Sequence, residues 1–145
     1  MTKTDEPLER GGGCLCGAVR YRISTEPLMV AICHCRHCQR QSGSAFSVVG
    51  IVSNDDYNQQ GETKVFRDIG DTGLSVNRHF CGRCGSPIVS VADAFPGVTI
   101  VKAGTLDEPD QWVPTQEAYC ANALLWLGEP STRQCFDRAN VGDQI

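Results

Sequence analysis

Cysteine is the residue type of this chain whose number and spacing carry the most chemistry. Seven of the nine cysteines fall into three short clusters, which are Cys14-Leu15-Cys16, Cys33-His34-Cys35-Arg36-His37-Cys38 and Cys81-Gly82-Arg83-Cys84. Two cysteines one or two residues apart bring two sulfur atoms near one point, as a tetrahedral metal site requires. The clusters contribute two, three and two thiols. This division predicts one closed four-thiolate zinc site and one three-thiolate zinc site with an open position.

The first and last clusters are the ones that we expect to share a metal ion. Each is followed by a glycine, Gly17 or Gly85, which lets the backbone turn so that its amides point at the sulfurs. Two such pairs far apart in the sequence would tie the N-terminal strand to the middle of the sheet. The sequence therefore predicts a closed structural zinc site made of Cys14, Cys16, Cys81 and Cys84.

The middle cluster then provides a local trio for a second zinc ion, made of Cys33, Cys35 and Cys38. The fourth ligand of this ion would be water, a substrate thiol or another side chain. In the alternative interpretation a protein side chain fills that position and the site is inert; the candidates are His37, His79, Cys120 and Cys135. Because His34 and His37 adjoin proposed ligands, we expect them to point away from the metal, and His79 to be a strand residue.

Length and composition favour one compact, soluble domain. The chain has 145 residues, of which 41% are hydrophobic and 21% charged, and no apolar run long enough to span a bilayer. Its formal charge of -4 argues against nucleic acid and anionic membranes as partners. The basic residues are scattered, so a local basic pocket for a small anionic substrate stays open.

The cysteine content and the N-terminus together predict a cytoplasmic protein. Residues 1–11 are polar and acidic without an apolar signal segment, and they are expected to form a disordered leader. In a reducing compartment clustered cysteines are more often metal ligands than disulfides. Cys120 and Cys135 stand alone in the sequence, so we expect them to be small buried hydrophobic residues.

Hydrophobic patterning predicts a mostly antiparallel β domain over residues 12–127 and a tail over 128–145. A single helical turn is expected at 36–42, since Cys35 and Cys38 share a helix face. The polar stretch 53–60 is expected to be a loop. Strands are expected at 17–23, 28–34, 45–52, 63–67, 74–80, 86–91, 98–103 and 117–121.

The order of the cysteine motifs closely resembles that of the glutathione-dependent formaldehyde-activating enzyme family, to which centromere protein V is related. The matching stretches run from residue 12 to Trp126 and are GGCLCGAVRYRI, CHCRHCQRQSGSAF, GETKVFRD, RHFCGRCGSPI and AGTLDEP. The resemblance implies a twisted antiparallel fold called a β-tent and the same division of two zinc ions. Cys14, Cys16, Cys81 and Cys84 match the structural ligands, whereas Cys33, Cys35 and Cys38 match the catalytic ones.

The activity that the resemblance implies joins formaldehyde and glutathione into S-hydroxymethylglutathione, a carbon–sulfur lyase reaction in reverse. The trio zinc would bind the thiol and lower its pKa, and the thiolate would attack the aldehyde carbon. Ser42, Gly43 and Ser44 follow the trio and either line the pocket or form an ordinary turn. One departure is Glu117, which stands where the family often has a histidine, and it bears on substrate identity.

Two other functions compete with this one. The chain could be a non-enzymatic module with two zinc ions that binds a protein partner, both metals serving stability. Alternatively, it could reduce methionine sulfoxide, as some β-tent proteins do. That activity needs a free reactive cysteine beyond the zinc ligands, and only Cys120 and Cys135 remain for it.

Overall fold

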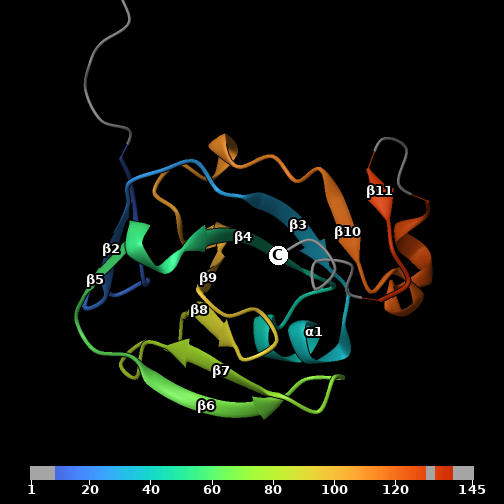
Figure 1. Ribbon diagram of the computed structural model, residues 1–145, viewed down its shortest axis with the longest axis horizontal. Coiled ribbons are helices and arrows are strands. Elements are labelled where there is room, and N and C mark those ends of the chain that lie inside the picture. Colours follow the sequence, from blue (N-terminus) through green and yellow to red (C-terminus); the bar gives the residue numbers. More distant parts are fainter. Residues whose placement is uncertain (1–8, 130–132, 139–145) are drawn as a thin grey trace, which may run out of the picture.

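The computed structural model describes residues 9–129 and 133–138, and its fold is mainly β, as the sequence predicts. A small sheet has the strand order β1-β2-β5 and a large sheet has the order β11-β10-β3-β4-β9-β8-β7-β6. In Figure 1 the small sheet lies at one end of the molecule and β10 and β11 at the other. The small sheet comprises β1 (Arg10–Gly13), β2 (Arg20–Ile23) and β5 (Tyr57–Gln60).

The large sheet is antiparallel from β3 to β6, whereas β10 runs parallel to both β3 and β11. The two parallel pairs fit the expectation of a mostly antiparallel domain, and they arise because the chain returns to the β3 edge by a long connection after β9. The strands of this sheet are β3 (Met29–Cys33), β4 (Ser47–Ser53), β6 (Lys64–Ile69), β7 (Ser75–Phe80), β8 (Pro87–Ala92), β9 (Val98–Lys102), β10 (Gln116–Ala118) and β11 (Gln134–Cys135).

Helix is scarce in the described part of the chain. The α-helix α1 (Arg36–Ser42) has the bounds that the sequence predicts, and Gly43 ends it. The 3-10 helices are η1 (Asn54–Asp56), η2 (Ala103–Thr105), η3 (Pro109–Gln111), η4 (Cys120–Asn122) and η5 (Leu125–Leu127). Within the described ranges, no helix has the length and apolar character that crossing a membrane would require.

Two sequence-based assignments differ from the structure. The stretch 53–60, expected to be a loop, contains η1 and the strand β5, whose polar residues alternate between half-buried and exposed positions beside β2. The sequence did not predict β5 because its residues are mostly polar. Its pairing with β2 depends on backbone hydrogen bonds, which leave no hydrophobic pattern in the sequence. Strand β1 begins at Arg10, inside the range 1–11 that was expected to be a leader. Residues 1–8 of that expected leader lie outside the described residues.

The main core lies between the two sheets. Val19, Tyr21 and Ile23 of the β2 side are buried against the large sheet, where Val101 is fully buried. Trp112 packs over the centre of β4, where Gly50 leaves room for its indole ring. A Cβ atom added at Gly50 would overlap this ring. The close approach of backbone and ring therefore requires glycine at this position.

We expect Gly50→Ala to lower the free energy of unfolding by about 1–3 kcal/mol, because the added methyl group overpacks the core beneath Trp112. The control is Gly104→Ala, since an added Cβ there meets no atom within 4 Å. This variant should stay within about 0.5 kcal/mol of the parent protein. Denaturant titration followed by circular dichroism measures both, and equal stability of the two variants would contradict the packing argument.

Candidate metal centres and the pocket at the three-cysteine cluster

The sulfurs of Cys14, Cys16, Cys81 and Cys84 gather at one point. They all lie within 4.8 Å of one another, although the two pairs are 65 residues apart in the sequence. The Cys14 and Cys16 sulfurs are 3.6 Å apart, and those of Cys16 and Cys81 are 3.8 Å apart. A tetrahedral zinc with Zn–S bonds of about 2.3 Å separates its sulfurs by about 3.8 Å. This four-sulfur cluster therefore fits a closed zinc site.

Backbone amides point at these sulfurs, as the turn motifs predict. The Val19 amide donates to Cys14 Sγ at 3.2 Å and the Arg83 amide donates to Cys81 Sγ at 3.4 Å. Ser86 joins the two halves, because its hydroxyl accepts from the Leu15 amide and lies 3.2 Å from Cys84 Sγ. Such donors stabilise thiolate over thiol, so the local backbone favours the form that binds metal.

The three sulfurs of Cys33, Cys35 and Cys38 also lie within 4.8 Å of one another, and we call them the trio. Cys33 is the last residue of β3, Cys35 caps α1 and Cys38 lies in the first turn of that helix. The Cys38 amide donates to Cys35 Sγ at 3.2 Å. Among the residues that the structure describes, no histidine, carboxylate or further cysteine joins this group. The trio therefore offers three ligands to a metal.

The trio lines a pocket of about 290 Å³, which we call the trio pocket. Its floor is one face of the large sheet, built from alternate residues of the six strands β10, β3, β4, β9, β8 and β7. Apolar side chains form most of this face, among them Val49, Ile51 and Ile100. A metal held by the trio would face an apolar pocket that is large enough for a small organic molecule.

Two buried cations face the trio across this pocket. Lys102 of β9 is 5% exposed and donates from Nζ to Ser47 Oγ at 3.0 Å. Arg78 of β7 is 7% exposed and donates from Nε to Asp68 Oδ2 at 2.8 Å. The charge of Lys102 has no carboxylate partner in the described contacts, so the negative trio is the group positioned to balance it.

The thiols of the trio are electrostatically coupled. Hydrogen bonds from Cys33 and then Cys35 hold the pKa of the Cys38 thiol far below its usual range, and Lys102 and Arg78 act in the same direction. Hydrogen bonds to Cys35 and Cys38 raise the pKa of Cys33. Burial lowers the pKa of Lys102, while the charge of Cys38 opposes this shift. The trio thus carries negative charge that a cation must neutralise.

The histidines lie away from both sulfur clusters, in agreement with the sequence analysis. His34 is buried on the opposite face of β3 and its Nε2 lies 2.6 Å from Glu117 Oε1. His37 is half-exposed at the pocket rim, where its Nδ1 lies 2.6 Å from Asp68 Oδ2. His79 lies in β7 and contacts the Thr63 hydroxyl.

Cys120 and Cys135 correct the expectation that they are unpaired, buried thiols. They form a disulfide, and Cys135 is exposed. Two isolated cysteines 15 residues apart give no signal in the sequence, because only the parallel pairing of β10 with β11 brings them together. The sulfur of Cys120 also lies within 4.8 Å of His34 and Glu117, but its bond to Cys135 keeps it from acting as a thiolate ligand.

The pocket also contains polar residues that the sequence did not single out. Lys102, Ser90 and Tyr119 reach it from three different elements, and their apolar neighbours in the sequence gave no reason to select them. Tyr119 has a left-handed backbone conformation with φ of 56°, and its hydroxyl donates to Asp71 Oδ1 at 2.8 Å. Ser42, Gly43 and Ser44 form the turn that ends α1 and are not among the residues that line the pocket.

A mainly β fold with two sulfur clusters that could each hold a metal ion defines the class of this protein. The family model described as glutathione-dependent formaldehyde-activating enzyme matches residues 9–122. The chain belongs to this family. The match includes all seven clustered cysteines and confirms the resemblance that the motifs suggested.

Curated relatives carry the same description as a provisional name. A protein of Podospora anserina is 24% identical over 135 residues, which are 90% of this chain and 59% of the relative. One of Halomonas elongata is 27% identical over 101 residues, 66% of this chain and 64% of the relative. The chain thus spans about six-tenths of the length of these two relatives.

A solved structure supports the fold. A crystal structure of a Rhodobacter sphaeroides protein superposes with a TM-score of 0.56 at 19% identity, covering 87% of this chain and 98% of the other. At this identity the likeness concerns the arrangement of the strands and carries no information about activity.

We expect the two sulfur clusters to contribute differently to the stability of the fold. Substitution of one cysteine in each cluster tests this expectation. Cys14→Ser breaks the cluster that links the start of β2 to the β7–β8 turn, and we expect its melting temperature to fall by about 10 °C or more, roughly 3 kcal/mol for a domain of this size. Cys35→Ser should keep the fold and lose one metal equivalent. Thermal melts and metal analysis by mass spectrometry measure both effects. Equal destabilisation by the two substitutions would contradict this division.

Proposed function

We propose that this protein is a zinc enzyme that makes or breaks the carbon–sulfur bond between a small thiol, such as glutathione, and a small aldehyde such as formaldehyde. In this proposal Cys14, Cys16, Cys81 and Cys84 hold a structural zinc ion, and Cys33, Cys35 and Cys38 hold a catalytic one. The observation that carries the proposal is the position of the trio in the wall of an apolar pocket of about 290 Å³. A ligand set of three donors facing a cavity is typical of catalytic zinc.

The donor set fits zinc in both clusters. Thiolates are soft ligands, and sets of four and three sulfurs at these separations select zinc over the oxygen-seeking cations. At the trio, bound zinc would supply a fourth coordination position at which an incoming thiol is held as its thiolate. The other steps of the reaction depend on groups of the chain itself.

The lining of the trio pocket suits two kinds of reactant. One is a small uncharged molecule, and the other is a molecule with an anionic end. The apolar side chains of Val49, Ile51 and Ile100 exclude water from the trio pocket. Electrostatic interactions inside the pocket are therefore stronger than in water. Lys102 and Arg78 place positive charge across the pocket. Carboxylates such as those of glutathione are ligands that the Arg78 guanidinium in the pocket would bind.

The positive charge of Lys102 also bears on the chemical step. When a thiolate attacks an aldehyde carbon, the carbon–sulfur bond forms and the electron pair of the C=O bond moves to oxygen. The resulting alkoxide needs a nearby positive charge or donor until it takes up a proton. Lys102 is held in place by Ser47 and is electrostatically close to the trio, so it is suited to stabilise this oxygen.

The pocket favours this enzyme function over a module in which both metals only stabilise the fold. A purely structural site needs no cavity beside an incomplete ligand set. The methionine sulfoxide reductase alternative would depend on the reduced form of the Cys120–Cys135 pair, because that activity needs a free thiol. We place the protein in a reducing compartment such as the cytoplasm, because the cysteines proposed as zinc ligands must stay reduced to bind metal.

The direct test measures exchange between free and adduct formaldehyde in mixtures with glutathione. Since this addition proceeds without a catalyst, nuclear magnetic resonance exchange spectroscopy at equilibrium is the suitable method. We expect the protein to raise the exchange rate above the spontaneous rate, and Cys35→Ser to remove the increase. An exchange rate that stays spontaneous for glutathione and for a panel of other small thiols would exclude the proposal.

Lys102→Gln tests the role of the buried cation. We expect kcat/KM to fall by about 100-fold, mostly through kcat, because the alkoxide loses its positive partner. The control is Arg67→Gln, which removes a positive charge from an exposed position on β6. It should leave the rate unchanged. Loss of rate in both variants would show that overall charge, and not Lys102, governs the reaction.

A further inference from the structure

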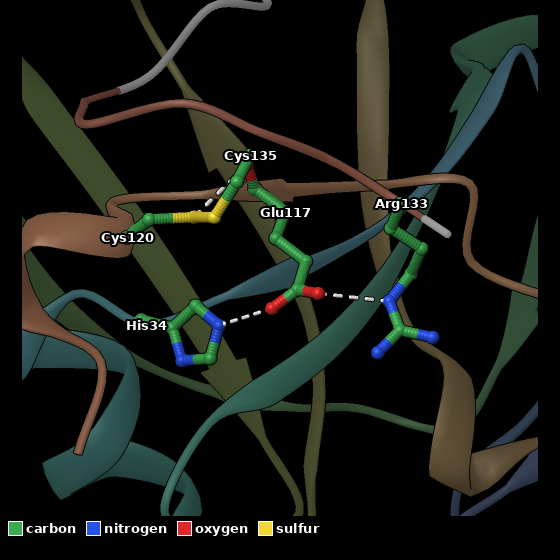
Figure 2. Close-up of a disulfide and its surroundings, with 5 residues drawn as sticks. All are labelled: His34, Glu117, Cys120, Arg133 and Cys135. Carbon is green, nitrogen blue, oxygen red and sulfur yellow. Dashed lines mark hydrogen bonds and ion pairs between the residues drawn. A yellow bond between two sulfur atoms is a disulfide. The ribbon is translucent and has the colours of Figure 1, made fainter. Parts of the chain in front are cut away.

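The Cys120–Cys135 disulfide lies in a setting that the proposed reaction does not use. It joins η4 to β11, with the two Cα atoms 6.1 Å apart, and Figure 2 shows it beside His34 and Glu117. Cys135 is an exposed residue, and Cys120 is half-buried. An exposed disulfide is open to thiol–disulfide exchange with small thiols in solution.

A second pocket of about 480 Å³ gives small molecules access to this bond. Both cysteines line it, together with Phe46 and the buried pair of His34 and Glu117. It lies on the opposite face of the sheet from the trio pocket, because neighbouring residues of a strand point to opposite faces. On β10, for example, Glu117 lines this second pocket and Ala118 lines the trio pocket.

We propose that the Cys120–Cys135 disulfide is an exchange site for a low-molecular-weight thiol, and that opening it releases the segment 133–138 from the wall of the trio pocket. The first part concerns a covalent modification site and is independent of zinc. The second part rests on the proposed function of the trio pocket, since it makes the state of the disulfide a regulator of that pocket.

The small thiol supplies the electrons and protons that reduction of the disulfide requires. The thiolate of the small thiol attacks the sulfur of Cys135; a new sulfur–sulfur bond forms to Cys135, and the bond to Cys120 breaks. Cys120 leaves with the electron pair and takes the proton that the small thiol gave up. A second molecule of the thiol then attacks the sulfur of the first; the small disulfide forms, and Cys135 leaves with the electron pair and takes up the proton of the second thiol. In total, two small thiols are oxidised to their disulfide and the protein disulfide is reduced to two thiols.

The segment 133–138 connects the disulfide to the trio pocket. The Arg133 Nε donates to Glu117 Oε2 at 2.9 Å, and Figure 2 shows this contact directly beside the disulfide. Further along, the Arg138 guanidinium binds Asp71 Oδ2 at 2.6 Å. Asp71 lines the trio pocket and accepts from the Tyr119 hydroxyl, which lines it as well. The segment therefore holds one part of the pocket wall in place.

Within the described residues, the remaining contacts of this segment are a short strand pairing and a few backbone hydrogen bonds. Strand β11 pairs with β10 over two register positions, and both of its residues are exposed. Its backbone bonds include the Phe136 amide to Glu117 O at 2.9 Å and the Cys120 amide to Phe136 O at 2.8 Å. A two-residue strand at a sheet edge has little apolar burial to keep it paired. In this proposal the covalent bond is what holds the exposed β11 edge together, and opening it weakens the contact of Arg138 with Asp71.

The exchange is tested on the full-length, zinc-loaded protein in glutathione buffers of increasing reduced-to-oxidised ratio, followed by alkylation and peptide mapping. We expect Cys120 and Cys135 to be unlabelled in the oxidised buffer and both labelled in the reduced one, with unchanged zinc content. Cys120→Ser, which leaves Cys135 alone, should gain one glutathione from the oxidised form. Labelling of both cysteines without any reductant, or resistance to glutathione until the protein is denatured, would overturn the exchange site.

The effect on the pocket is tested with the double variant Cys120→Ser/Cys135→Ser, in which the link is permanently open. Hydrogen–deuterium exchange should increase over 133–138 and over 69–71, the turn that carries Asp71. As a control, Arg138→Gln with the disulfide intact should raise exchange at 69–71 and leave 133–138 protected. Unchanged exchange at 69–71 in the double variant would refute the coupling, whatever the exchange chemistry does.

Thiol binding separates this coupling from the proposed function. Cobalt in place of zinc at the trio gives an absorption band that changes when an outside thiol binds, and titration with glutathione then gives Kd. We expect a Kd about fivefold higher for the double variant than for the parent protein, a coupling of ordinary size. Equal Kd values would overturn the coupling alone. Absence of thiol binding in both proteins would overturn the proposed function and its regulation, and leave the exchange site standing.

Discussion

Repulsion among crowded thiolates is the constraint on which this structure depends. Four sulfurs in one cluster and three in the other lie within 4.8 Å of their neighbours, and at such distances they cannot all be ionised without cations among them. Different groups of the chain stabilise the negative charge in the two clusters. Backbone amides and Ser86 surround the four-sulfur cluster, whereas buried Lys102 and Arg78 face the trio. Fixed positive charge therefore lies next to the cluster that offers three ligands, and backbone donors lie next to the cluster that offers four.

Because successive residues of a strand point to opposite sides, the two faces of the large sheet carry different functional groups. Cys33 faces the trio pocket, while His34, the next residue, is buried on the other face against Glu117. The same alternation sends Ala118 to one side and Glu117 to the other. Glu117 lies between His34 and Arg133, with Oε1 at 2.6 Å from His34 Nε2 and Oε2 accepting from Arg133 Nε at 2.9 Å. This position consequently serves the far face of the sheet and does not contact the trio pocket.

The parts of the site that sequence predicted are those encoded by short-range spacing. The C-x-C and C-x-x-C pairs, the helical turn 36–42 and the alternating or apolar strands each depend on residues close together in the chain. The pairing of the two outer clusters across 65 residues was also predicted, because two such turn motifs together supply four thiols. The resemblance to the family implied the same division between a closed and an open cluster that the spacing had predicted.

The parts that sequence missed depend on long-range pairing. Lys102 faces the trio only because β9 lies beside β4 in the sheet, and Ser47, its hydrogen-bond partner, is 55 residues away. The disulfide requires the parallel return of β10 and β11. Strand β5 is polar and is recognised only once β2 is beside it. No local pattern encodes these neighbours, since each arises from the order in which strands assemble.

The position of Trp112 over Gly50 gives the protein an internal optical reporter. Its indole is 4% exposed and belongs to the same buried cluster as Cys14 and Cys81, on the small-sheet side of the molecule. The other tryptophan, Trp126, is 74% exposed. The emission of the two rings should therefore be spectrally distinct. The buried Trp112 should emit at shorter wavelength, and a shift of this emission reports loosening around the four-sulfur cluster. The emission of the exposed Trp126, at longer wavelength, serves as an internal reference.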